Sequence, residues 1–260
     1  MPTARPHATD REPGSPDQPP GTRGAIASRD GSGNRARRPG GPPRARRSAL
    51  LFPAAVLAAL VLAVYFPVLG HDFVHWDDDV YVFENPRVLF GLDAGSAAWA
   101  LTALHEGTWQ PLTWLSYLID ASGGVDPRRF HATNLALQVA AALLLFFALR
   151  RLLRDAFPTP GVPVLLSPAF LAGALFAVHP LNVEVVAWVS ARKDLLAAVC
   201  WFLAILLYAR YAERPQPRRM LPVAVVFLLG LMAKPVVMTL PVILLVLDFW
   251  PLARIARGQP

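Results

Sequence analysis

The chain has very little cysteine and little charge. Its one cysteine, Cys200, excludes an internal disulfide and a cysteine-based metal site. Charged residues make up only 17% of the sequence and hydrophobic residues 54%, which is too apolar for an ordinary soluble domain of this length. P-loop, GxGxxG and GxSxG motifs are also missing, and with them the usual signatures of nucleotide binding and serine hydrolysis. The composition therefore predicts a polytopic membrane protein.

Positive charge is concentrated at the N-terminus. The net charge is +7, and residues 1–50 hold ten arginines against four acidic residues. Residues 1–47 contain almost no large apolar side chain, so we expect a disordered, basic tail. The positive-inside rule places this tail in the cytoplasm. No aromatic residue is interleaved with its arginines as a stacking platform, which argues against nucleic acid as a partner.

Six apolar stretches predict six membrane crossings. They cover residues 48–69 and, approximately, 134–153, 165–178, 195–212, 220–233 and 236–250, compared with the roughly 20 residues that a spanning helix needs. The first stretch is too long and too far from the N-terminus for a cleaved signal, so we expect a signal anchor. We therefore expect an all-α membrane protein with a multi-spanning domain over residues 48–250 and a cytoplasmic end at 251–260.

The charges between these stretches agree with a cytoplasmic tail. The loops near 150–164, 210–219 and beyond 251 then face the cytoplasm, and all of them carry arginine. The long segment 70–130 faces outward and holds nine acidic residues against three arginines. Within it, residues 97–105 and 111–119 have helix-like apolar spacing. Their neighbourhood contains Trp99, Trp109, Trp114 and Tyr117, which suit helices lying on the membrane surface.

Three consecutive carboxylates stand at the start of this acidic segment. Asp77, Asp78 and Asp79 directly follow Trp76, just beyond the first apolar run. A charge beside the hydrocarbon is costly and tends to be kept where a substrate, a partner or a cavity uses it. A carboxylate beside others has a raised pKa and can act as a general base toward a hydroxyl. This cluster is the leading candidate for a catalytic site.

The predicted topology brings further ionisable residues to the same membrane surface. A cation near the carboxylates can stabilise charge on a leaving phosphate, so the clustering predicts an active site. Arg192 and Lys193 also fit ordinary topology charges at the start of a helix, and both interpretations stay open. The residues gathered there are His105, Glu106, His131, His179, Glu184, Arg192, Lys193, Asp194 and Lys234.

Histidines on this side raise the question of a metal ion. His105, His131 and His179 do not stand at the HxxxH spacing that places two ligands on one helical face, so a zinc site is not favoured. Adjacent aspartates without a glycine-containing loop do not form an EF-hand. A divalent ion held by Asp77 and Asp79 stays open, and no cofactor is assigned.

Several short motifs follow one another at fixed spacing. They comprise Phe73, Trp76, Asp77, Asp78, Tyr81, Val82, Asn85 and Pro86; Pro111, Leu112 and Thr113; His131 and Asn134; Phe176, His179, Pro180, Glu184 and Val186; Arg192, Asp194, Leu195 and Leu196; and Lys234, Pro235, Thr239, Leu240 and Pro241. In this order, over roughly residues 65–250, they resemble the membrane half of the transmembrane and tetratricopeptide-repeat O-mannosyltransferase family. That family is similar to the other multi-spanning (GT-C) glycosyltransferases, which use lipid-linked sugars.

The resemblance implies an enzyme that moves a sugar, mannose, from a polyprenyl phosphate to a Ser or Thr hydroxyl of a protein at the outer membrane face. It implies Asp77 as the general base and Asp78 as its partner or as an acceptor ligand. It implies that substrate or lipid phosphate is bound by His131, His179, Glu184, Arg192 and Lys234. The bias toward Ala, Arg, Pro and Gly suits a bacterial source, so we expect an inner-membrane protein with its active loop, residues 70–130, in the periplasm.

The chain also departs from this family. The family's chains continue through more membrane helices and repeats of about 34 residues, whereas this sequence stops at Pro260 with neither. We therefore expect either a fragment or a chain whose remaining half is supplied elsewhere, and an isolated six-helix half would lack part of the lipid-sugar groove. Two other classes stay open. A transporter predicts ionisable residues in mid-helix, and a non-catalytic scaffold predicts that lipid-linked sugar does not bind.

Overall fold

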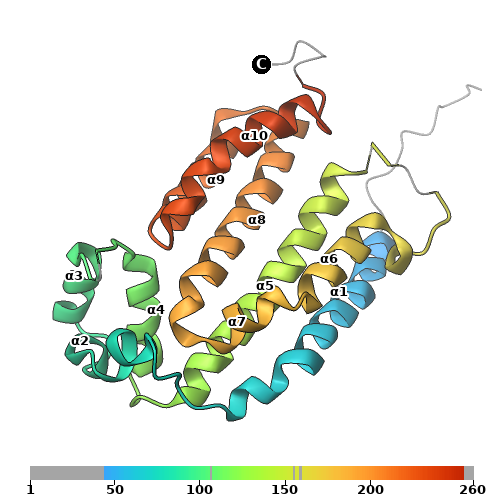
Figure 1. Ribbon diagram of the computed structural model, residues 1–260. Helices are drawn as coiled ribbons and strands as arrows, with labels where there is room; N and C mark the ends of the chain where they lie inside the picture. The colour runs from blue at the N-terminus through green and yellow to red at the C-terminus, as the bar shows by residue number, and fades with distance from the viewer. Residues whose placement is uncertain (1–43, 106, 155, 158–159, 255–260) are drawn as a thin grey trace, which may run out of the picture. The chain divides into compact units, whose positions relative to one another are not determined.

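The computed structural model describes residues 44–105, 107–154, 156–157 and 160–254 (Figure 1). This part of the chain is built from helices, and its only β-type pairing is one isolated bridge between His105 and Thr108. An all-α membrane protein is therefore confirmed. Most of the expected basic tail, Glu106 and the last six residues lie outside the described residues.

Among the described residues, three helices are long and apolar enough to cross a membrane. The first span, Leu50–Gly70, combines most of α1 (Arg44–Tyr65) with η1 (Phe66–Gly70). The second is α5 (Pro127–Leu152), and the third combines η4 (Val189–Ala191) with α8 (Arg192–Glu213). At 1.5 Å per residue, their 21, 26 and 25 residues exceed the roughly 30 Å of hydrocarbon in a bilayer.

The number of full crossings is smaller than the six expected from the sequence. Helix α6 (Pro168–Val178) and α7 (Leu181–Ala187) form a fourth span only as a pair bent by 60°. Pro180 supplies no backbone N–H and keeps His179 in an extended conformation, which separates the two helices. Helix α9 (Pro217–Leu231) and the segment η5 (Pro235–Thr239) plus α10 (Leu240–Phe249) each have only 15 residues. Both apolar stretches are already shorter than a span in the sequence, and both helices begin at a proline.

Helix α5 lies at the centre of the helical bundle (Figure 1). On one side it packs against α1 and α6, where Phe146 and Phe170 are buried and the absence of a side chain at Gly173 leaves room for the Cα and Cβ atoms of Phe146. On the other side it packs against α8, which in turn covers α9 and the η5 and α10 segment. The spans thereby bring the segments 71–130, 179–194 and 232–239 to one end, which we call the acidic end. The opposite end, with residues 150–169, 208–219 and 250–254, is called the basic end.

The acidic end contains four short helical elements between the first two spans. They are the π-helical turn η2 (Asp79–Phe83), α2 (Pro86–Leu89), α3 (Ala94–Thr102) and α4 (Pro111–Ala121). Asn85 and Asp93 cap α2 and α3 by accepting backbone hydrogen bonds from Arg87 (3.0 Å) and Ser96 (2.6 Å). These caps explain how such short helices hold their positions.

The two expected surface helices are present as α3 and α4, but their aromatic residues differ from expectation. Trp114 and Tyr117 are completely buried and form a core with Tyr81 and Phe130. The assignment of these two side chains to the membrane surface is therefore wrong. Helix α4 is amphipathic because one face packs on the protein, and that face takes the rings. Trp109, by contrast, is 43% exposed.

Candidate functional site

Asp78 connects the first loop of the acidic end to the turn before α8. Its side chain is fully buried. One carboxylate oxygen accepts a hydrogen bond from the backbone N–H of Val74 at 3.0 Å, and the other accepts one from Ser190 at 2.8 Å, 112 residues further along the chain. Burial raises the pKa of the Asp78 carboxyl, and the two hydrogen bonds oppose that rise. The two oxygens thus join the segment of Val74 to the segment of Ser190.

The carboxylates on either side of Asp78 are more accessible. Asp77 and Asp79 are both partly exposed. Asp79 accepts a hydrogen bond from the backbone N–H of Val80 at 2.8 Å. Within the described part of the chain, the Asp77 carboxylate has neither a hydrogen-bond nor an ion-pair partner. Asp77 is therefore the member of the run whose oxygens can accept a proton from a substrate.

Arg192 is enclosed where α4, α5 and α8 meet. It forms an ion pair with Asp120 at 2.6 Å and donates hydrogen bonds to Asn134 and to the carbonyl of Phe130, both at 2.8 Å. The Tyr117 ring centroid lies 4.7 Å from the Arg192 guanidinium carbon. Because the side chain is 0% exposed, this geometry favours a role in positioning three helices over contact with a phosphate.

The remaining expected site residues lie in different surroundings. His131 is fully buried, with Nε2 3.4 Å from the carbonyl oxygen of Asp72. His179 is exposed at the break between α6 and α7, where its Nδ1 accepts a hydrogen bond from the Leu181 N–H at 3.3 Å. Glu184 is exposed on α7 and lines two hollows. Of these three residues, Glu184 is best placed to touch a ligand.

Three hollows adjoin one another at the acidic end. The first, of about 480 Å³, is lined by His71, Asp72, Val74, Trp76, Val183, Glu184, Ala187 and Trp188. The second, of about 270 Å³, is lined by Glu184, Val185, Trp188, Ser190, Ala191, Lys193, Asp194 and Lys234. The third, of about 310 Å³, is lined by Asp194, Ala197, Ala198, Trp201, Phe202 and Val236. Glu184 and Trp188 separate the first hollow from the second, and Asp194 separates the second from the third.

The second hollow is lined by two lysines and two carboxylates, Lys193 and Lys234 with Glu184 and Asp194. Lys234, in the turn after α9, pairs with Asp194 at the start of α8. The Lys193 ammonium lies 5.0 Å from the ring centroid of Tyr81. Side chains of the Lys234 and Asp194 pair are each 35% exposed, so an anion entering the hollow can reach the ammonium group.

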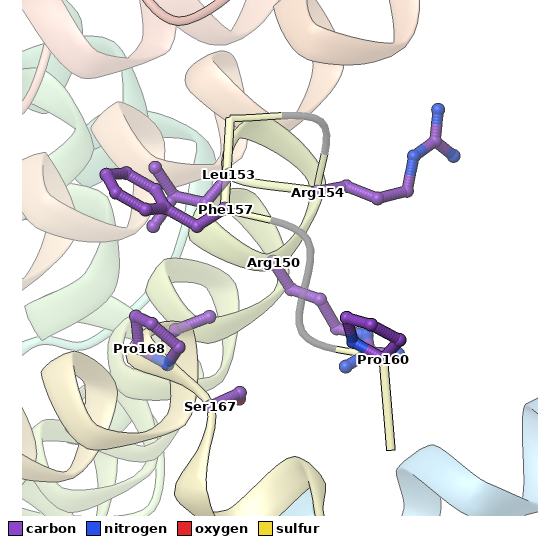
Figure 2. Close-up of a pocket in the computed structure, with 8 residues that line it drawn as sticks. Arg150, Leu153, Arg154, Phe157, Pro160, Ser167 and Pro168 are labelled. Atoms are coloured by element: carbon purple, nitrogen blue, oxygen red, sulfur yellow. The ribbon is translucent and has the colours of Figure 1, made fainter. Parts of the chain in front are cut away.

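A fourth hollow, of about 390 Å³, lies at the basic end of the bundle (Figure 2). It is lined by residues from the end of α5, the following loop and the start of α6, among them Arg150, Arg154 and Phe157. Figure 2 shows Arg150 running toward Pro160 and Arg154 pointing away from the other lining residues. Arg154 also lies 3.8 Å from Glu213. The described residues that line this hollow include no carboxylate, and the Asp77 run lies at the other end, so we do not assign sugar transfer to it.

Two important residues were not singled out from the sequence. Asp120, the partner of Arg192, is an acidic residue on the otherwise apolar helix α4, and that contrast was a usable signal. Trp188 forms the shared wall of two hollows, and nothing in its sequence surroundings distinguishes it from a membrane-surface tryptophan.

A possible metal pair in the sequence does not form a cluster in the structure. His71 and His75 have HxxxH spacing, but their segment is not helical, so the spacing does not place both rings on one face. His71 contacts the His131 ring, and His75 contacts the Phe83 ring. Across the described ranges, no group of three or more His, Cys, Asp or Glu side chains is arranged to hold a metal ion.

Comparison with known proteins gives a consistent set of relatives. The chain is 30% identical to Drosophila melanogaster "Protein O-mannosyl-transferase Tmtc2" over 83% of its own length and 23% of that protein. It is 33% identical to Drosophila Tmtc1 over 59% of the chain and 18% of the relative, and 30% identical to Homo sapiens TMTC1 over 73% and 21%. The chain thus spans about a quarter or less of the length of these relatives. Protein-family models and solved structures give no match.

Proposed function

The chain belongs to the family of TMTC protein O-mannosyltransferases, and on that premise we propose that it carries the donor site and the general base of a membrane glycosyltransferase. The donor is a polyprenyl phosphate that carries mannose, and the acceptor is a Ser or Thr hydroxyl of a protein. Because the matched region is a minor part of each relative, the activity proposed is that of the complete protein to which this chain contributes.

The observation that carries this proposal is the order of the three adjoining hollows. A lipid-linked sugar consists of a hydroxyl-rich ring, a phosphate and a hydrocarbon chain. The first hollow has carboxylates and indole rings, and the second has Lys193 and Lys234 together with Glu184 and Asp194. The third has Trp201, Phe202 and small apolar residues on the membrane-spanning helix α8. The chemistry of the lining therefore follows the chemistry of the donor from one end to the other.

Asp77 supplies the proton acceptor in this proposal. The acceptor hydroxyl oxygen attacks C1 of the sugar while its proton passes to the Asp77 carboxylate. The bond between C1 and the phosphate oxygen breaks, and its electron pair leaves with the polyprenyl phosphate. Lys193 and Lys234 compensate the charge that develops on that phosphate. Asp78 does not take the proton, because both of its oxygens accept backbone hydrogen bonds, and it instead fixes the position of Asp77.

The arrangement of charge does not favour a transport pathway. A pathway for ions requires acidic or basic side chains along the spans. In the described parts of α1, α5 and α8, these side chains lie within the first or last turns, as Arg192, Asp194, Arg210 and Glu213 do in α8. The buried pair of Arg192 and Asp120 is at the acidic end and joins helices.

The test is transfer of radiolabelled mannose from polyprenyl phosphate to an acceptor peptide by the protein from its complete gene, reconstituted in liposomes. Asp77→Asn keeps the side-chain size and removes the base, so we expect transfer to fall about 10²- to 10⁴-fold. Asp79→Asn is the matched control, because Asp79 adjoins the same turn but lies outside the proposed pair. Transfer by Asp77→Asn at the control rate, with equal protein in the membrane, would refute the assignment of the base.

A further inference from the structure

We propose that the first hollow holds the sugar ring of the donor and that Trp76 and Trp188 supply the surfaces on which the ring stacks. This inference rests on the proposed function and adds to it the part of the site that recognises the sugar. In this proposal, Trp76 and Trp188 determine the affinity for the donor. Asp77 and the lysines act on the bonds that form and break.

The size and lining of the hollow suit a sugar ring. Its volume of about 480 Å³ falls in the range of roughly 300 to 1,000 Å³ found for small-molecule sites. Such sites combine apolar and aromatic walls with a few polar groups. Here Val74, Val183 and Ala187 provide the apolar wall, and His71, Asp72 and Glu184 provide the polar groups.

The two indoles are the distinguishing feature. The apolar C–H face of a pyranose ring packs well on an aromatic ring, whose quadrupole is negative at its face. Trp76 is 76% exposed, so its ring is uncovered in the absence of a ligand. Trp188 is partly buried, and in the described structure its indole N–H is enclosed without a hydrogen-bond acceptor. The Trp188 ring lines the hollow, and it is this ring, rather than the enclosed N–H, that a sugar can contact.

Carboxylates complete the recognition of the hydroxyl groups. Asp72 and Glu184 stand at the hollow from opposite segments, one in the loop after α1 and the other on α7. Neither is engaged in an ion pair within the described residues. A carboxylate accepts hydrogen bonds from two neighbouring hydroxyls, which is how it discriminates between sugars that differ in the orientation of one of them.

The position of the hollow agrees with the direction of the reaction. Asp77 follows Trp76 directly, so their Cα atoms are about 3.8 Å apart. Glu184 and Trp188 also line the second hollow, which holds Lys193 and Lys234. A ring seated in the first hollow can therefore have its C1 substituent at the boundary with the lysines.

The experiment separates sugar recognition from binding of the lipid phosphate. The protein from its complete gene is placed in nanodiscs of zwitterionic lipid, and Kd is measured for polyprenyl phosphate and for the same lipid carrying mannose. For the wild type we expect the mannosylated lipid to bind on the order of tenfold more tightly. Trp76→Ala should lose that advantage while its Kd for polyprenyl phosphate stays within about twofold to threefold, and Trp76→Phe should recover part of it.

Trp109→Ala is the matched control, since Trp109 is an exposed indole of the acidic end outside all three hollows. It should keep the full advantage for the mannosylated lipid. If Trp76→Ala still binds the mannosylated lipid more tightly than polyprenyl phosphate, the first hollow does not hold the sugar ring, and the proposed function is unaffected. Equal binding of both lipids by the wild type would also refute this role of the first hollow. A wild type that binds neither lipid would refute both this role and the proposed donor.

Discussion

At the scale of single residues, the acidic end separates charges that act on a ligand from charges that hold the fold. Asp77 and Lys234 are partly exposed, whereas Asp78 and Arg192 are 0% exposed and bonded to protein groups from distant segments. The sequence motifs contain both kinds of residue. The motif pattern alone therefore locates the site, but it does not tell which residues act on a ligand and which hold the fold.

The ion pair between Arg192 and Asp120 gives a prediction at this scale. Arg192→Gln leaves a carboxylate that is almost fully enclosed without its cation, so we expect a loss of about 3 to 5 kcal/mol in stability. The measurement is thermal unfolding of the purified protein in detergent. Lys193→Gln, next in sequence but partly exposed, should change the unfolding temperature little.

A double variant shows whether the pair itself is responsible. Asp120→Asn combined with Arg192→Gln should cost clearly less than the sum of the two single changes, since neither charge is then left alone. If the loss of stability in the double variant equals the sum of the two single losses, the ion pair does not have the role given to it.

At the scale of helices, the turn between α9 and η5 places Lys234 beside Asp194. Gly230 makes this possible because it has no side chain, so α9 can pack closely against η5 and α8. A Cβ at Gly230 would lie 2.8 Å from the Val237 Cγ1 atom and 3.1 Å from the Cys200 Cβ atom. The turn therefore depends on the lack of a side chain at one position of α9.

Gly230→Ala is expected to destabilise the protein by about 1 to 3 kcal/mol through overpacking and to displace Lys234. In an assay of polyprenyl phosphate binding, its Kd should rise together with the loss of stability. Gly70→Ala is the comparison, because no atom lies within 4 Å of a Cβ at Gly70. Equal behaviour of the two variants would mean that the turn does not set the position of the lysine.

Helix-scale features were only partly predictable from the sequence. The long apolar runs of α1, α5 and α8 predict spans because a run of 20 or so apolar residues has few alternatives. The third stretch was counted as one straight crossing, because hydropathy does not report that Pro180 separates α6 from α7. The last two stretches form helices of 15 residues, below the roughly 20 that a span needs. The buried rings of Trp114 and Tyr117 could not be predicted either, since a helix that packs on protein and one that lies on lipid show the same periodicity.

At the scale of the whole chain, one bundle carries opposite charge at its two ends. The acidic residues of 70–130 and the arginines of 150–154 and 210–219 lie at the ends of the same spans, as the charge pattern predicted. Contacts across the acidic end, such as that from Asp78 to Ser190, show that segments far apart in sequence meet there. The structure shows which residues share an end, and the positive-inside rule predicts which end faces the cytoplasm.

Cysteine labelling tests this orientation. Cys200 is buried, so single cysteines introduced at exposed positions report with little background. We expect Glu84→Cys at the acidic end to react with a membrane-impermeant maleimide in intact spheroplasts, because that end faces outward in the proposed reaction. Gln216→Cys, exposed between α8 and α9 at the basic end, should react only after the membrane is permeabilised. The reverse pattern would place Asp77 and the three hollows in the cytoplasm, where transfer to an exported protein could not occur as proposed.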